Sequence, residues 1–174
     1  DIDIPMPFEE LRAMVLDFCR RIDSPDAMAY VQATRGVGMR GHAYRFAGGT
    51  PSLWVWVKPD MLDPMDRSYK CITMEDTRYL HCDIKTINLL PAVIYTQRAE
   101  EAGCDETILH RGERVTECAH SNVHILKDGV FKTAPCDNLI LPGITRAHRI
   151  AQCREMGIPV MEEPFTLEEM MNAD

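Results

Sequence analysis

The sequence lacks the features that mark several large classes of protein. No apolar run approaches the roughly 20 residues that a membrane helix needs; the longest, such as residues 88–95, are far shorter. No basic face accompanies the formal net charge of −8, so we expect no nucleic-acid partner and no membrane partner. The chain also contains no internal repeat and no low-complexity tract. These absences favour a soluble enzyme or binding domain that acts on small molecules.

Cysteine is present but not in a pattern that implies a structural role. The seven cysteines are odd in number and form no Cys-x-x-Cys pair, which argues against a disulfide framework and a structural zinc site. Reduced thiols are typical of cytoplasmic proteins, so we expect a cytoplasmic location. The 174 residues are 45% apolar and 26% charged, a composition typical of one globular domain or of parts of two.

The first third of the chain predicts a helix followed by two strands. Apolar residues recur at helical spacing over residues 7–22, and residues 28–34 and 53–57 read as strands. Residues 59–66 then combine prolines with aspartates. Because proline and short polar residues interrupt regular structure, we interpret 59–66 as an interdomain linker.

The rest of the chain mixes hairpins with helices. In order, the pattern predicts a strand, a helix, two hairpins, a short strand, a helix, a strand and a last helix, at residues 69–74, 88–102, 106–118, 122–133, 139–141, 145–156, 160–165 and after 166. Gly103 ends a helix, Asp128-Gly129 is a strong hairpin turn, and Thr166 with Glu169 forms a capping box. This order predicts the α+β class, not a doubly wound sheet.

Three places in this part of the chain could carry chemistry. Lys85 precedes an apolar helix; a buried lysine can become a Schiff-base residue, although most lysines in such a setting are solvated. Glu117 ends a hairpin, where it could enter a pocket or lie at the surface. Residues 139–146 pass through Pro-Gly into a helix, whose first N–H groups could bind an anion or form an ordinary helix start.

A fourth candidate lies in the first third of the chain. Arg40 and His42 are two positions apart in a glycine-rich loop, residues 35–42. An arginine can bind a carboxylate through two parallel hydrogen bonds, and a histidine can add a third donor. The alternative is a solvent-exposed loop without a ligand.

In order and spacing, Lys85, Glu117 and residues 141–146 resemble the fold-type IV enzymes that use pyridoxal 5′-phosphate (PLP), the class IV aminotransferases. The D-amino acid aminotransferase subgroup is the most similar, through residues 82–90 around the lysine and through the Arg40-x-His42 pair. The resemblance covers essentially the whole chain.

The resemblance implies a role for each matching residue. Lys85 would bind PLP as a Schiff base and then move the proton between the substrate Cα and the cofactor. Glu117 would keep the pyridine nitrogen protonated. Ile144 and Thr145 would hold the phosphate, and Leu141 would pack on the ring.

The resemblance also implies a reaction and a domain layout. Arg40 and His42 would bind the substrate carboxylate from the neighbouring subunit of a homodimer. The reaction would be transamination between a D-amino acid, such as D-alanine, and a 2-oxo acid, such as 2-oxoglutarate. Residues 1–58 would form part of a small N-terminal α/β domain, 59–66 the linker, and 67–174 the larger PLP-binding domain.

The chain departs from the family pattern in two respects. His120 stands where some relatives have serine, so its role is open. The family's first strands and its C-terminal stretch, which supply further phosphate and substrate contacts, have no counterpart here. We therefore expect the chain to be incomplete at both ends.

Three alternatives remain open at this point. The chain could belong to another class IV enzyme: a branched-chain aminotransferase, an (R)-amine transaminase or an aminodeoxychorismate lyase. It could be a metal hydrolase, since His110, His120 and His124 lie within fifteen positions. It could also be a binding module without catalysis.

Overall fold

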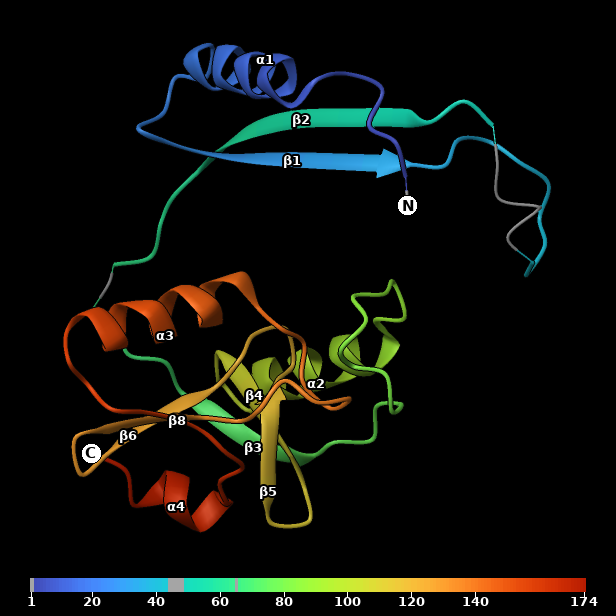
Figure 1. The fold of residues 1–174 in the computed structure, drawn as a ribbon. Helices are drawn as coiled ribbons and strands as arrows, with labels where there is room; N and C mark the ends of the chain where they lie inside the picture. The colour runs from blue at the N-terminus through green and yellow to red at the C-terminus, as the bar shows by residue number, and fades with distance from the viewer. Residues whose placement is uncertain (1, 44–48, 65) are drawn as a thin grey trace. The chain divides into compact units, whose positions relative to one another are not determined.

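The computed structural model describes residues 2–43, 49–64 and 66–174, and it divides the chain into two units. The N-terminal unit runs from Asp1 to Arg67 and the C-terminal unit from Ser68 to Asp174. Figure 1 labels the helices and strands of both units.

The N-terminal unit is a helix on a two-stranded sheet. Helix α1 (Phe8–Arg20) precedes strands β1 (Asp26–Thr34) and β2 (Ser52–Asp60), which pair antiparallel. The helix lies along the hairpin (Figure 1) and buries Leu11. The predicted helix and both predicted strands are confirmed. Strand β2 continues to Asp60, two residues into the segment that we predicted as the linker.

The C-terminal unit contains two small mixed sheets. Its elements in chain order are β3 (Cys71–Glu75), α2 (Leu90–Glu101), β4 (Glu106–Arg111), β5 (Arg114–Cys118), β6 (His124–Lys127), β7 (Val130–Thr133), α3 (Ile144–Glu155), β8 (Val160–Glu162) and α4 (Leu167–Met171). One sheet has the order β3-β4-β5 and the other β6-β7-β8. Both β3–β4 and β7–β8 are parallel pairs, each with a helix in the connection, as parallel pairing requires. The α+β prediction is confirmed.

Two buried clusters hold this unit together. One contains Val115, Ile125, Ile140 and Phe165, and so joins β5, β6 and the segment after β8. The other packs Tyr95 of α2 against Leu109 of β4. The polar end of Tyr95 also bonds to the chain after β3: its hydroxyl accepts from the Thr77 N–H at 2.8 Å. Helix α2 is thus fixed against the end of β3, where the segment that leads to Lys85 begins.

The local turn signals are confirmed. Gly103 has a φ of 68°, the left-handed conformation that a helix-ending glycine adopts. Asp128 and Gly129 have φ values of 50° and 75°, as a type I′ turn between two strands requires. Helix α4 begins with the complete capping box of Thr166 and Glu169.

Two predicted strands need correction. Residues 139–141 are not a strand, because the backbone N–H groups of Leu139 and Ile140 both donate to Asp137 in a local turn. Strand β8 ends at Glu162 and does not reach 165. Pro164 follows, and proline has no N–H with which to continue a ladder. In the described part of the chain, no helix combines the length and apolarity that a membrane crossing demands.

Candidate active site

One cavity of about 830 Å³ lies within the C-terminal unit. Five of the residues singled out from the sequence line it: Lys85, Glu117, Leu141, Ile144 and Thr145. They come from three separate stretches of chain, namely the loop before α2, the end of β5, and the loop that leads into α3. The fold therefore brings together groups that lie up to 60 positions apart (145 − 85 = 60).

The carboxyl group of Glu117 is buried and accepts hydrogen bonds at both oxygens. Its side chain is 6% exposed. Oε1 accepts from Arg78 Nη1 at 2.5 Å, and Oε2 accepts from Asn122 Nδ2 and the Leu141 N–H, each at 3.0 Å. Burial raises the pKa of Glu117 above its ordinary value, although the hydrogen bond and charge of Arg78 act in the opposite direction. Glu117 is thus a carboxyl whose charge depends on its neighbours.

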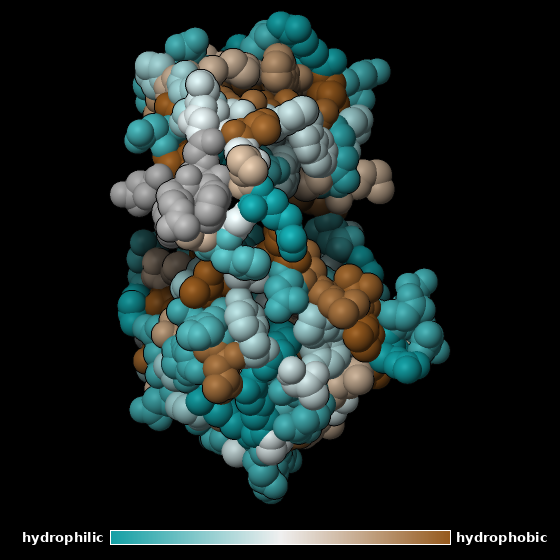
Figure 2. All heavy atoms as spheres, turned by 90° about the vertical axis from the view of Figure 1, so that its right-hand side faces the viewer, coloured by the Kyte–Doolittle hydropathy of each residue, from teal (hydrophilic) through white to brown (hydrophobic). Residues whose placement is uncertain are grey.

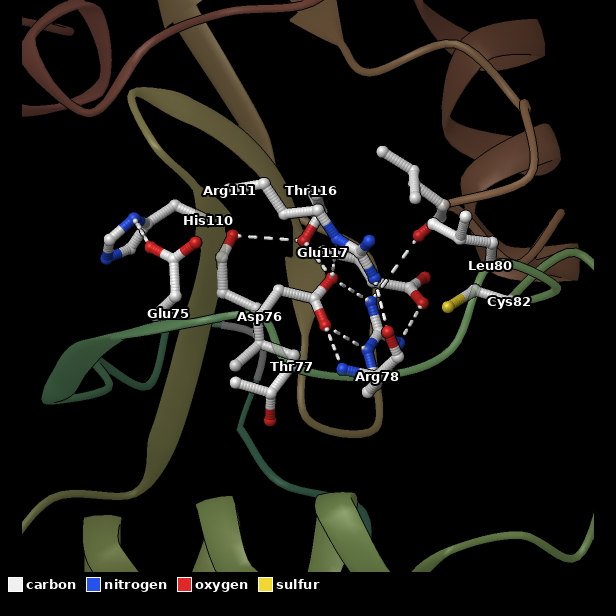
Figure 3. A network of polar contacts seen from close by, with 12 residues as sticks. Glu75, Asp76, Thr77, Arg78, Leu80, Cys82, His110, Arg111, Thr116 and Glu117 are labelled. Carbon is white, nitrogen blue, oxygen red and sulfur yellow. Dashed lines mark hydrogen bonds and ion pairs between the residues drawn. The ribbon is translucent and has the colours of Figure 1, made fainter.

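Arg78 connects Glu117 to a second buried carboxylate (Figure 3). Its Nε and Nη2 donate to the two oxygens of Asp76, both at 2.9 Å. Burial disfavours the charged form of Asp76, but the hydrogen bonds from Arg78 outweigh it and lower the pKa of this carboxyl. Arg111 adds a second cation, with Nε 3.4 Å from Asp76 Oδ2. Two arginines and two carboxyl groups therefore lie together, and Arg78 and Glu117 of this set line the cavity.

The N-terminus of α3 forms the other polar part of the cavity wall. Gly143 is the N-cap residue and offers no side-chain cap, so the first N–H groups of the helix have no partner within the helix. A Cβ at position 143 would lie 2.1 Å from Asn122 Oδ1. Glycine therefore lets the helix start approach the side chain that holds Glu117. Free N–H groups and the positive end of the helix dipole suit an anion such as a phosphate.

Lys85 lines the cavity but is exposed, so the structure of this chain does not bury its amine. The loop that carries it is anchored at Cys82, whose N–H donates to the Asn138 carbonyl at 2.9 Å. Beyond this anchor, the apolar neighbours Ile84 and Ile87 are 56% and 97% exposed. Figure 2 shows such apolar side chains at the surface as brown patches.

Arg40 and His42 do not belong to this cavity. Both lie in the N-terminal unit and both are exposed, in the loop that follows β1. Their predicted role toward a substrate carboxylate stays a prediction.

The three histidines have separate partners. His124 lines the cavity, and its Nδ1 lies 2.9 Å from Thr133 Oγ1. Burial, together with the positive charges of Arg146 and Arg149, lowers the pKa of His124 to about 4, so its ring is neutral near pH 7.

The other two histidines face carboxylates. The Nε2 of His120 lies 3.2 Å from Glu106 Oε2, and His110 lies beside Glu75. Across residues 2–43, 49–64 and 66–174, no three His, Cys, Asp or Glu side chains are placed to hold a metal ion. The histidine spacing therefore reflects local contacts in the fold.

Sequence reasoning missed three residues of this site: Asp76, Arg78 and Asn122. Asp76 and Arg78 follow the end of β3 and are two positions apart, and this spacing of opposite charges was the local signal for an ion pair. Asn122 lies five positions after Glu117. Nothing in either stretch indicates that Arg78 and Asn122 both bond to Glu117, or that Asp76 holds Arg78 there.

Comparison with known proteins agrees with this geometry. The family model described as amino-transferase class IV matches residues 1–174. A D-alanine aminotransferase of Listeria monocytogenes is 40% identical over 178 residues, which cover 100% of this chain and 62% of that protein. The chain thus spans about 62% of the length of this curated relative.

Solved structures share the fold. A fold IV-transaminase from Curtobacterium pusillum superposes with a TM-score of 0.76 at 26% identity, covering 95% of this chain and 58% of that one. An aminotransferase from Brucella abortus bound to PLP superposes with a TM-score of 0.77 at 21% identity, covering 99% of this chain and 64% of that one. The arrangement of helices and strands around the cavity is that of these enzymes.

Proposed function

Because this chain belongs to the class IV aminotransferase family, we propose that it forms the cofactor-bearing part of a PLP-dependent aminotransferase for D-amino acids. The reaction transfers the amino group of a D-amino acid such as D-alanine to a 2-oxo acid such as 2-oxoglutarate. The relative named D-alanine aminotransferase, at 40% identity over the full chain, supports this choice of substrate class. Since the chain spans 62% of that relative, the activity of the whole protein is part of the proposal.

The observation that carries the proposal is the single cavity shared by Lys85, Glu117 and the start of α3. These are the three kinds of group that PLP needs: an amine, a carboxyl group and an anion-binding helix N-terminus. These groups come from three separate stretches of the chain, so it is the fold, and not closeness in the sequence, that brings them together.

The residues present fit the cofactor. The glycine at position 143 lets Asn122 lie against the helix start, and the first N–H groups of α3, which no side chain caps, suit a phosphate. Glu117 is buried beside the same cavity and suits a pyridine nitrogen. When bound, PLP supplies an electron sink for the electrons released at the substrate Cα.

Each protein group then has a separate task. Lys85 would hold the cofactor covalently through its amine and would carry the proton to and from the substrate Cα. Glu117 would favour a proton at the pyridine nitrogen through its negative charge. Ile144 and Thr145 would hold the phosphate, and Leu141 would pack against the ring.

The proposal includes a homodimer in the cytoplasm. Arg40 and His42 bind the substrate carboxylate of the neighbouring subunit, where a guanidinium and an imidazole offer three donors. The exposed apolar side chains Ile87, Leu90 and Val93 support an interface, because a water-exposed patch of this kind favours association.

A covalent-labelling experiment tests the cofactor assignment. The purified protein is mixed with PLP, reduced with borohydride and digested, and the modified peptide is identified by mass spectrometry. We expect the label on Lys85, no label in Lys85→Ala, and an unchanged label in Lys70→Ala, since Lys70 does not line the cavity. A label on another lysine in the wild-type protein would overturn the assignment.

A substrate panel tests the reaction. The full-length protein is assayed with D-alanine, L-leucine and an (R)-amine as amino donors and 2-oxoglutarate as acceptor. The proposal requires D-alanine to be the best donor. A preference for L-leucine or for the (R)-amine would assign the protein to another class IV activity.

A further inference from the structure

Arg78 is shared unequally by two buried carboxylates. It offers Asp76 two side-chain nitrogens, Nε and Nη2, in the fork geometry typical of strong arginine–carboxylate pairs. It offers Glu117 only Nη1. The Arg78 side chain is 14% exposed, and the two carboxylate side chains are 0% and 6% exposed, so these contacts are little screened by water.

Further contacts stabilise Asp76 as an anion. Oδ2 also accepts from Thr116 Oγ1 at 3.0 Å, and Oδ1 accepts from the Arg78 backbone N–H at 3.0 Å. Arg111 adds a further cation, with its Nε 3.4 Å from Asp76 Oδ2. A carboxylate with this many donors keeps its charge and its position.

We propose that Asp76 is a positioning residue that acts on Glu117 through Arg78. Asp76 binds two nitrogens of the guanidinium, so Arg78 donates one hydrogen bond to Glu117 and shares its positive charge between the two carboxyl groups. Neither Asp76 nor Arg78 has a role in the function proposed above. Asp76 and Arg78 together set how strongly Glu117 holds a proton.

The two thiols that interact electrostatically with Glu117 do not supply a competing charge. They belong to Cys82 and Cys118. Burial raises the pKa of Cys82, and burial raises that of Cys118 to about 12, so both thiols are uncharged at neutral pH. Asn122 and the Leu141 N–H are neutral donors. Of the three groups bonded to Glu117, Arg78 is the charged one, and Asp76 holds that charge in place.

The consequence for catalysis rests on the proposed function. If Arg78 paired with Glu117 alone, the full positive charge would compete with a protonated pyridine ring for the same carboxyl group. By drawing the guanidinium to itself, Asp76 leaves Glu117 able to favour a proton at the ring nitrogen.

The experiment follows the titration of Glu117 directly. The full chain is labelled with glutamate carrying ¹³C in the side-chain carboxyl group, and NMR follows that signal against pH, with the Glu117→Gln protein identifying the peak. In Asp76→Asn the titration of Glu117 should move to lower pH, because Arg78 loses its preferred partner. In Glu75→Gln it should stay unchanged, because the Glu75 side chain is 57% exposed and pairs with His110, not with Arg78 or Glu117.

Two further variants separate position from charge. Asp76→Glu keeps the negative charge but cannot grip the fork in the same way, so it too should move the Glu117 titration to lower pH. Arg111→Gln leaves Asp76 with Arg78 as its remaining cation, so it should move the titration to higher pH; this variant decides the question if the Asp76 variants fail to fold. An unchanged titration in Asp76→Glu or a shift to lower pH in Arg111→Gln would overturn the proposal. Since no cofactor is added, the result does not depend on the labelling of Lys85.

Discussion

The tightest contact in the site predicts that Gly143→Ala disrupts Glu117 through Asn122. A Cβ at position 143 would lie 2.1 Å from Asn122 Oδ1 and 3.3 Å from its Cγ. Since a non-bonded contact this short is not tolerated, the amide must turn away. It then loses its hydrogen bonds to Glu117 Oε2, at 3.0 Å, and to the Leu141 carbonyl, at 2.9 Å.

The loss in free energy of unfolding follows from those two hydrogen bonds. A hydrogen bond to a charged group contributes about 1.5–3 kcal/mol and one between neutral groups about 0.5–1.5 kcal/mol. Replacing glycine by alanine restores about 0.4–1 kcal/mol by restricting the unfolded chain, since the φ of Gly143, −69°, is one that alanine adopts freely. The two lost bonds cost about 2–4.5 kcal/mol, so Gly143→Ala should destabilise the C-terminal unit by about 1–4 kcal/mol.

The assay must report on the C-terminal unit alone, because the chain contains two units. Amide hydrogen exchange at Val115 and Phe131 does so, since both N–H groups are bonded to carbonyls within this unit. The decisive comparison repeats Gly143→Ala in an Asn122→Ala background. There the collision is absent, so alanine at 143 should be neutral or slightly stabilising, and the coupling should be about 2–4 kcal/mol.

A matched control is Gly157→Ala at the end of α3. Gly157 has a φ of 74° with open space around it, so alanine should cost about 1 kcal/mol through backbone conformation alone, with or without Asn122. If Gly143→Ala cost the same in both backgrounds, or less than about 1 kcal/mol, the link from the helix start to Glu117 would be refuted.

Three further predictions test other parts of the site. Glu117→Gln should retain the cofactor but slow the exchange of the D-alanine Cα proton with deuterated solvent by roughly 10–100-fold, because a charged hydrogen bond is lost; unchanged exchange would remove Glu117 from the mechanism. His124 titrates near 6.5 when unfolded and near 4 when folded, so its contribution to stability is present above pH 6.5 and is lost as pH falls toward 4. His124→Phe should flatten the dependence of unfolding free energy on pH in that window, and an unaltered slope would contradict the burial of a neutral ring. Arg40→Leu in the full-length protein should raise KM for D-alanine roughly tenfold or more, the value of a charged hydrogen bond; an unchanged KM for D-alanine would exclude Arg40 from carboxylate binding.

Several features of the fold could be predicted because their causes lie within a few residues. The turn at Asp128-Gly129 needs only two residues that accept a positive φ. The capping box at Thr166 and Glu169 satisfies helix N–H groups three positions apart. Residues 139–141 show the limit of this reasoning: they have the apolar character of a strand, yet Asp137 takes the hydrogen bonds that a strand would use.

The sequence by itself determined which residues are candidates for the site: the order of lysine, glutamate and Pro-Gly helix start is a local pattern, and the structure places all three in one cavity. Only the tertiary structure decided the electrostatics. Arg78 meets Glu117 across 39 positions and Leu141 meets it across 24, because the segment after β3 and the segment before α3 both pack against β5. The charge of a buried carboxyl depends on every donor within a few ångströms. Such donors are set by packing between distant segments, and no local pattern in the chain contains them.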